Sequence, residues 1–366
     1  MKPFFSIAIP CCDVEPFVAE CLRSVLDQSF QDWECLIGIE TSSDRTEEII
    51  REMTAGDPRF RIFTGPRTGS CSASRNSAIA IADGEYVIFL DGDDTIADGC
   101  LERLHEKIMA NPGADLYPCT IIANNEITGE RELRDNYRAD APTEMSGQEA
   151  TIYLHQQWNG RFCPMLQLTI FRRKFLTENE LRCIRGLRCQ DSEFSPRALF
   201  LAKRVIPLHE PFYLYRIHEG SIQTKVKDTD YFQYFLKDWA VITGSLLDFY
   251  GKVSKNANYD PRETACWVRQ WLSRMNAMWF SPKAVRQIPR KKRRETLEFI
   301  FANGFWAHRD MLRCCGSSVQ IMAGFWVRFF VKHRYLGWIS ELFFRFFFRA
   351  AAQKKNETGS FQTPLP

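Results

Sequence analysis

Three carboxylates follow a short apolar stretch of the sequence. Asp91, Asp93 and Asp94 come directly after residues 86–90, which read Tyr-Val-Ile-Phe-Leu. Carboxylates this close repel one another unless a cation lies between them. Their oxygen atoms suit Mg²⁺ or Mn²⁺, ions that usually share their coordination with substrate phosphates. A solvated acidic turn has the same composition, so the position after a buried strand is what favours a metal site.

The segments around these carboxylates alternate between strand and helix patterns. Short apolar runs predict strands at residues 4–10, 35–39, 61–63 and 86–90. Apolar residues at helical spacing predict helices at residues 15–28, 44–53 and 73–82, with Ser43 or Asp44 capping the second. This alternation predicts an α/β fold, with a Rossmann-like, mostly parallel sheet and flanking helices on both faces.

Three polar, acidic segments leave the carboxyl ends of the predicted strands. They are residues 10–15, 40–44 and 91–94. Ligands of parallel sheets bind beyond these strand ends. The convergence of the three segments therefore predicts the place of the ligand site.

Five short elements, taken in order, resemble the family 2 inverting glycosyltransferases, which have the A-type glycosyltransferase fold. The opening element is Ser-Ile-Ala-Ile-Pro at residues 6–10, followed by a helix that ends in Ser-Val-Leu-Asp-Gln-Ser-Phe at residues 24–30. The other four are Ser-Arg-Asn at 74–76, Phe-Leu-Asp-Gly-Asp-Asp at 89–94, Gly-Leu-Arg-Cys-Gln-Asp-Ser-Glu-Phe at 186–194 and Tyr-Leu-Tyr-Arg-Ile-His-Glu-Gly-Ser at 213–221. The resemblance covers residues 4 to about 224, and its motifs specify a family but not a substrate.

The resemblance implies a nucleotide-sugar site at the amino-terminal strands. Pro10, Asp13 and Glu15 would line the nucleotide pocket, and Glu40 would contact the base. Arg75 would lie near the nucleotide or its phosphates. A UDP-sugar is the donor that the family favours.

The resemblance also implies the catalytic and metal-binding residues. Asp91 would lie near the ribose and the metal, Asp93 would bind the metal, and His218 would be a late metal ligand or a diphosphate contact, with Mn²⁺ or Mg²⁺ as cofactor. Asp191 would be the general base that removes the proton of the acceptor. An inverting transfer needs one such base and departure of the diphosphate on the opposite side. Glu193 is the competing base, although the geometry of either a strand or a helix would direct it away from Asp191.

Four positions depart from the family pattern. Cys12 replaces an aromatic residue, Asp13 an asparagine, Ile39 the first acid of a paired turn, and Gln190 the acid before the base. Loss of the stacking aromatic leaves the identity of the base open, and the departures together leave open a weakened activity.

The remainder of the chain predicts a second, helical part. We expect a catalytic domain at residues 1–225, a helical extension at 226–357 with helices at 231–249 and 261–280, and a disordered tail at 358–366. Residues 325–348 are rich in Phe and Trp and broken by basic residues, and residues 290–294 are all basic. This pattern fits a helix in the membrane interface and equally a subdomain packed on the catalytic domain. A spanning helix needs about 20 apolar residues, which this segment lacks.

Composition narrows the class of protein. The chain has 366 residues, a net charge of +3 and 13 cysteines without a CxxC pair. The charge is too small to indicate a nucleic acid partner, and the cysteine spacing carries no zinc signature. Reduced, mostly buried thiols fit a cytoplasmic protein, placed either in solution or peripherally at the inner face of the cytoplasmic membrane.

The sequence therefore predicts a metal-dependent inverting glycosyltransferase. It would move a sugar from a nucleotide diphosphate-sugar to a hydroxyl of a saccharide or lipid-linked saccharide, in cell-surface polysaccharide or glycolipid synthesis. A nucleotidyltransferase is the alternative enzyme, but residues 10–15 lack the glycine-rich basic loop of that class. A degenerate sugar-, nucleotide- or membrane-binding protein of the same fold is the alternative outside the enzymes.

Overall fold

A computed structural model describes residues 2–158, 165–221, 229–253 and Glu263. The chain divides into two compact units, one of residues 1–221 and 248–270 and the other of residues 222–247 and 271–366. The first unit contains every residue predicted above for the active site. The predicted domain limits stay a prediction, since most of the expected extension lies outside the described residues.

A six-stranded sheet forms the centre of the first unit. Its order is β3-β2-β1-β4-β9-β6. The strands are β1 (Phe5–Cys11), β2 (Trp33–Glu40), β3 (Phe60–Gly65), β4 (Tyr86–Phe89), β6 (Leu116–Pro118) and β9 (Thr169–Arg172). The first four are parallel, while β9 is antiparallel to both β4 and β6. The predicted α/β fold with a mostly parallel sheet is confirmed.

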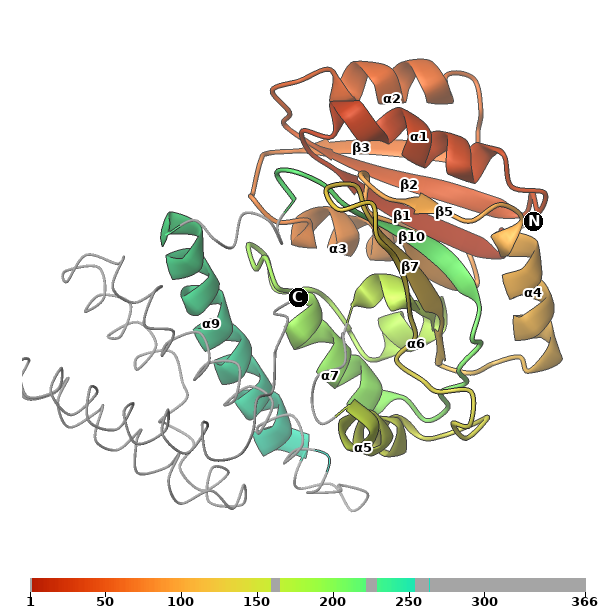
Figure 1. The fold of residues 1–366 in the computed structure, drawn as a ribbon, viewed down its shortest axis with the longest axis vertical. Helices are drawn as coiled ribbons and strands as arrows, with labels where there is room; N and C mark the ends of the chain where they lie inside the picture. The colour runs from red at the N-terminus through yellow and green to blue at the C-terminus, as the bar shows by residue number, and fades with distance from the viewer. Residues whose placement is uncertain (1, 159–164, 222–228, 254–262, 264–366) are drawn as a thin grey trace, which may run out of the picture. The chain divides into compact units, whose positions relative to one another are not determined.

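Helices cover both faces of this sheet. Figure 1 shows α1 (Glu15–Leu26) and α2 (Thr46–Thr54) on one side of it and α3 (Ser72–Ile81) on the other. Further along the chain come α4 (Cys100–Ala110), α5 (Gly147–Trp158), the 3-10 helix η1 (Leu166–Leu168), α6 (Arg173–Glu178) and α7 (Asp191–Leu201). The three helices predicted before residue 90 are confirmed to within a few residues.

Strand burial explains why the sheet forms from these segments. Every residue of β2 is buried, and β1 is buried except at Pro10. Such continuous burial is expected of parallel strands that are covered on both faces. Gly38 in β2 is required by this packing, because a Cβ there would lie 2.7 Å from both the Phe63 ring and the Ser74 Cβ.

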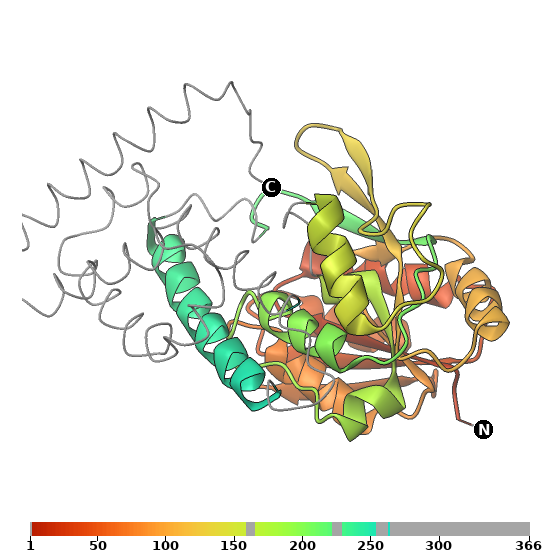
Figure 2. The ribbon, with the colours of Figure 1, turned by 90° about the horizontal axis from the view of Figure 1, so that it is seen from below.

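A second, four-stranded sheet was not anticipated from the sequence. Its order is β5-β10-β7-β8, formed by Thr95–Ile96, Pro211–Ile217, Thr120–Asn125 and Arg131–Arg134. Strand β10 pairs antiparallel to β5 and parallel to β7. In Figure 2 the hairpin of β7 and β8 (yellow) stands out from the rest of the unit. The sheet brings β10 beside the acidic segment that follows β4.

Asp44 contributes to the start of two helices. Its Oδ1 accepts the Thr46 N–H at 3.1 Å, at the first residue of α2, and its Oδ2 accepts the Glu15 N–H at 2.9 Å, at the first residue of α1. Asp44 therefore acts from one residue before Arg45, which is the N-cap of α2. Its carboxylate satisfies amide groups that the first turn of a helix leaves unpaired.

The carboxyl-terminal predictions fall largely outside the described residues. The helix predicted at 231–249 is confirmed, within α9 (Thr229–Val253). The predicted helix at 261–280, the basic residues 290–294 and the aromatic segment 325–348 lie outside, apart from Glu263. Among the described helices, none has the length and apolar character to cross a membrane.

Candidate active site

The predicted site residues come from the carboxyl ends of β1, β2 and β4, from α3 and α7, and from the residue after β10. The segment after β4 is held by β10. Asp94 is 1% exposed. Its Oδ2 accepts the Tyr213 hydroxyl at 2.5 Å and its Oδ1 accepts the Arg216 N–H at 2.7 Å. Burial raises the pKa of Asp94. The third acid of the cluster is therefore a buried anchor that joins the two sheets.

Gly92, between Asp91 and Asp93, lets the chain pack closely against the end of β1. A Cβ at this position would lie 3.0 Å from the Cys11 Sγ and 3.2 Å from the Pro10 carbonyl oxygen. The turn is thus packed directly against the end of β1. The Arg216 Nε also donates to the Asp93 carbonyl at 3.0 Å, which fixes the turn from the other side.

Asp91 is held by two side chains from distant parts of the chain. Its Oδ1 accepts the Arg75 Nη2 at 2.5 Å, and its Oδ2 accepts the Gln167 Nε2 at 2.5 Å. Arg75 is 1% exposed and Gln167 is 4% exposed. Gln167 belongs to no motif of the sequence, since it comes from η1. Only its contact with Asp91 identifies it.

Arg75 links Asp191 to Asp91, since its guanidinium group contacts both carboxylates. The Arg75 Nη1 is 3.4 Å from the Asp191 Oδ1. Asp191 is the first residue of α7. Burial raises its pKa to about 6, although the nearby Arg75 charge opposes that rise. A carboxylate with this pKa is ionised at neutral pH and accepts a proton more readily than an ordinary aspartate.

Helix α3 holds the segment that leads to Asp191. The Leu187 carbonyl accepts the hydroxyls of Ser70 at 2.5 Å and Ser72 at 3.1 Å. Asn76 exchanges two 2.8 Å hydrogen bonds with the backbone of Cys183. The Ser-Arg-Asn element thus positions the base-bearing segment as well as contributing Arg75.

Glu193, the competing base, is engaged with another residue of its own helix. It is 1% exposed and forms an ion pair with Arg197 on the same helix, with a nitrogen–oxygen distance of 2.6 Å. The choice of Asp191 over Glu193 as the base stays a prediction.

Three buried polar atoms belong to residues that contact Asp91 or Asp191 or precede Asp191 in the chain. Arg75 Nε, Gln167 Oε1 and Gln190 Oε1 have no hydrogen-bond partner among the residues that the structure describes. Unpaired buried atoms of this kind are uncommon in folded proteins and often mark a catalytic or water-binding position.

Asp93 and His218 form the second pair of predicted ligands. The His218 Nε2 is 3.4 Å from the Asp93 Oδ2, and this contact raises the pKa of His218. Two ligands of one Mg²⁺ ion lie about 3 Å apart when each is about 2.1 Å from it in octahedral geometry. The described residues contain no cluster of three or more metal-binding side chains. The Asp93–His218 distance is compatible with one edge of a divalent metal site, whose other ligands would have to come from phosphate and water.

The predicted nucleotide residues lie at the ends of β1 and β2. Asp13 accepts the Ser43 N–H at 2.6 Å and pairs with Arg67 at 2.5 Å. The Glu15 Oε2 accepts the Arg45 N–H at 2.9 Å. Glu40 is 5% exposed, and both of its oxygen atoms accept hydrogen bonds from Thr68, at 2.6 and 2.9 Å. Pro10 lies at the end of β1, opposite Gly38 in the parallel register.

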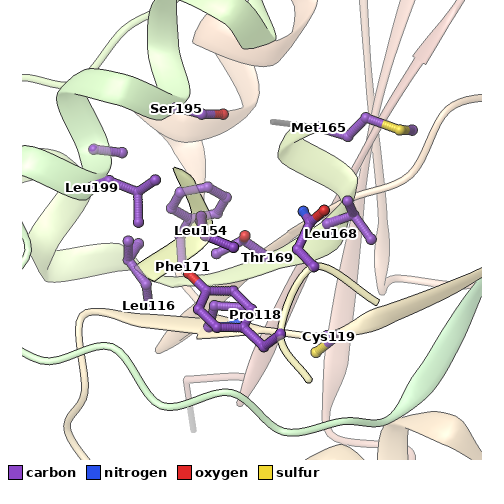
Figure 3. Close-up of a pocket in the computed structure, with 13 residues that line it drawn as sticks. Leu116, Pro118, Cys119, Leu154, Met165, Leu168, Thr169, Phe171, Ser195 and Leu199 are labelled. Atoms are coloured by element: carbon purple, nitrogen blue, oxygen red, sulfur yellow. The ribbon is translucent and has the colours of Figure 1, made fainter. Parts of the chain in front are cut away.

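An apolar cavity of about 40 Å³ lies among residues of η1, β6, β9, α5 and α7 (Figure 3). Its lining includes Leu168 beside Gln167, Met165 just before η1, Phe171 of β9 and Leu199 of α7. None of the predicted site residues lines it. The cavity is therefore separate from the carboxylates that would do the chemistry.

A comparison with protein families finds one model that matches. Residues 6–178 match the model described as glycosyl transferase family 2. The match ends before Asp191 and His218, so the placement of those residues depends on the structure.

Two curated relatives each match 61% of the chain. The uncharacterized glycosyltransferase EpsJ of Bacillus subtilis (strain 168) is 30% identical over 223 residues, which cover 61% of this chain and 63% of that protein. The glycosyltransferase GlyG of Streptococcus pneumoniae serotype 4 is 24% identical over 222 residues, which cover 61% of this chain and 73% of that protein. The chain thus spans less than two thirds of the length of EpsJ.

Among solved structures, residues 1–349 of TarS from S. aureus, crystallised in complex with UDP-GlcNAc, have a similar fold. The TM-score is 0.62 and the identity 20%, and the match covers 82% of this chain and 79% of that one. At this identity the similarity establishes the fold.

Proposed function

We propose that the chain transfers a sugar from a nucleotide diphosphate-sugar to an acceptor hydroxyl, with inversion at the anomeric carbon, because residues 6–178 match the model of glycosyl transferase family 2. The observation that carries this proposal is the contact of Arg75 with both Asp91 and Asp191. This contact supports a single site that contains Asp91, at the proposed nucleotide-sugar pocket, and Asp191, the candidate base. The two aspartates are 100 positions apart in the sequence.

Asp191 accepts the proton of the acceptor hydroxyl. The acceptor oxygen forms the new bond to the anomeric carbon while the bond from that carbon to the diphosphate oxygen breaks. The electron pair of the broken bond leaves with the nucleoside diphosphate, and the proton remains on Asp191. Attack and departure on opposite sides of the sugar give inversion with a single base.

Asp93 and His218 would hold a Mn²⁺ or Mg²⁺ ion together with the oxygen atoms of the diphosphate. Such an ion supplies positive charge that balances the departing diphosphate. Asp91, fixed by Arg75 and Gln167, would orient the ribose and the donor sugar beside it. Its carboxylate is already bonded on both oxygen atoms, which suits a positioning residue more than a full metal ligand.

The donor proposed is a UDP-sugar, and the acceptor a saccharide or a lipid-linked saccharide in cell-surface polysaccharide or glycolipid synthesis. TarS, which has a similar fold, was crystallised with UDP-GlcNAc. A cytoplasmic location, with or without peripheral contact to the inner face of the membrane, is part of the same proposal.

A degenerate binding protein of the same fold is the second candidate. The residues that favour it are Cys12, Ile39 and Gln190, where the chain departs from the family pattern. This candidate binds a nucleotide-sugar but does not turn it over.

Release of nucleoside diphosphate from a panel of nucleotide-sugars, with Mn²⁺ or Mg²⁺, separates the two candidates. We expect turnover that chelation of the metal abolishes. Asp191→Asn should lower turnover by about 10² to 10⁴-fold, the usual contribution of a positioned base, while donor binding remains. Asp140→Asn is the matched control, because Asp140 is 75% exposed and remote from the motifs. A wild-type chain that binds a donor but turns none over identifies the binding protein.

A further inference from the structure

The mouth of the proposed nucleotide pocket is built from the ends of three strands. Cys12 and Asp13 follow β1, Ser43 follows β2, and Arg67 follows β3. Asp13 has a φ of 51°, a left-handed conformation that residues other than glycine adopt uncommonly. Its Oδ1 accepts both the Ser43 N–H at 2.6 Å and the Ser43 hydroxyl at 3.1 Å. The three strand ends are thus tied together by one carboxylate.

Arg67 is attached to this structure by one edge of its guanidinium group. The Arg67 Nη1 is 2.5 Å from the Asp13 Oδ2, while 53% of the Arg67 side chain remains exposed. The Ser43 N–H, and after it Arg67, lower the pKa of Asp13, so the carboxylate is charged at neutral pH and holds the arginine. The guanidinium also lies near the Cys12 thiol. Burial raises the pKa of this thiol, and the charge of Arg67 opposes the rise.

Position 12 carries a thiol and no ring. The glycosyltransferases that the opening element resembles have an aromatic residue at this position, where it can stack on the nucleobase. A thiol is too small to cover a base. A guanidinium group is planar, stacks on aromatic faces and remains charged.

We propose that Arg67 is the residue that stacks on the nucleobase of the donor, in place of the aromatic side chain that Cys12 replaces. This inference rests on the function proposed above. Asp13 is then a positioning residue that orients the Arg67 guanidinium. Glu40 contacts the edge of the base. Each Glu40 oxygen has a second lone pair available besides the one that Thr68 uses.

Equilibrium binding of UDP and of inorganic pyrophosphate tests the proposal, with GDP as a second base. Stacking on one base contributes about tenfold to a hundredfold in affinity. We expect Arg67→Ala to weaken UDP binding by that factor and to leave pyrophosphate binding unchanged. Arg67→Lys, which keeps the charge but loses the plane, should bind UDP as weakly as Arg67→Ala. The double variant Arg67→Ala, Cys12→Phe should regain most of the affinity.

Three results would overturn the proposal: equal losses for UDP and pyrophosphate, full recovery in Arg67→Lys, or unchanged UDP binding in Arg67→Ala. The first two would show that Arg67 acts through its charge on the phosphates. Melting temperatures measured without ligand establish that each variant is folded. Failure of the wild-type chain to bind any nucleoside diphosphate would instead refute the function on which this inference rests.

Discussion

At the scale of single residues, the proposed chemistry depends on two opposing effects on the pKa of Asp191, its burial and the nearby charge of Arg75. Removal from water raises its pKa, while Arg75, 3.4 Å away, stabilises the ionised form. The resulting pKa of about 6 keeps the carboxylate ionised at neutral pH while making it more basic than an exposed aspartate. One arginine therefore serves both the candidate base and Asp91.

The pH dependence of kcat/KM should report this balance. Only the ionised form of Asp191 accepts a proton, so activity should rise with pH and level off above a pKa of about 6. The profile of kcat/KM between pH 4.5 and 8 provides the measurement. A plateau that continues down to pH 4.5 would contradict the assignment of Asp191 as the base.

Gln167→Leu should lower kcat/KM by about tenfold to a hundredfold. The substitution preserves size but removes a hydrogen bond to a charged group, which is worth about 1.5–3 kcal/mol. Gln167→Glu should be worse, because it places a second carboxylate beside Asp91. Gln156→Leu, at an exposed position of α5, is the matched control. If Gln167→Leu lowers the melting temperature but leaves kcat/KM unaltered, Gln167 has only a structural role.

At the scale of elements, the site depends on close packing between the central sheet and its neighbours. Helix α3 meets β2 at Gly38. It holds the segment before α7 through Ser72 and Asn76, together with Ser70 just before the helix. Strand β10 holds the segment after β4 through Tyr213 and Arg216. The segments that carry the candidate residues Asp91, Asp93 and Asp191 are therefore held by elements other than their own.

Gly38→Ala should destabilise the protein by about 1–3 kcal/mol, the usual cost of overpacking a core. The added Cβ would lie 2.7 Å from both Phe63 and Ser74, so β2 and α3 would have to separate. Gly65→Ala on the neighbouring strand is the control, since a Cβ there meets nothing within 4 Å. Chemical denaturation of both variants gives the comparison, and equal stabilities would contradict the close packing at Gly38.

At the scale of the whole molecule, the aromatic and basic segments of the carboxyl-terminal part remain a prediction. Residues 290–294 and 325–348 lie outside the described residues, and the sequence fits both a membrane-interfacial helix and a packed subdomain. Under the interfacial interpretation, part of the protein should be recovered with the membrane fraction. Removal of residues 320–350 should release it. Cell fractionation of both forms is the measurement, and recovery of the complete chain wholly in the soluble fraction would favour the packed subdomain.

Local patterns in the sequence were sufficient for the central sheet and its first three helices. Apolar runs and helical spacing arise from burial within a few consecutive residues, so β1 to β4 and α1 to α3 can be recognised without tertiary information. The order of the motifs likewise led to Asp91, Asp93, Asp191 and His218 as candidates.

Tertiary structure alone decided which of these side chains meet and what holds them. Strand β5 has two residues and β10 pairs with segments about 90 and 120 residues before it, so neither pattern nor length could reveal the second sheet. Gln167 and Arg67 carry no periodic or motif signal, because an isolated polar residue looks the same in a solvated loop as beside a buried carboxylate. Their contacts arise only when distant segments are brought together, since hydrogen bonds and ion pairs depend on distance in space and not on separation along the chain.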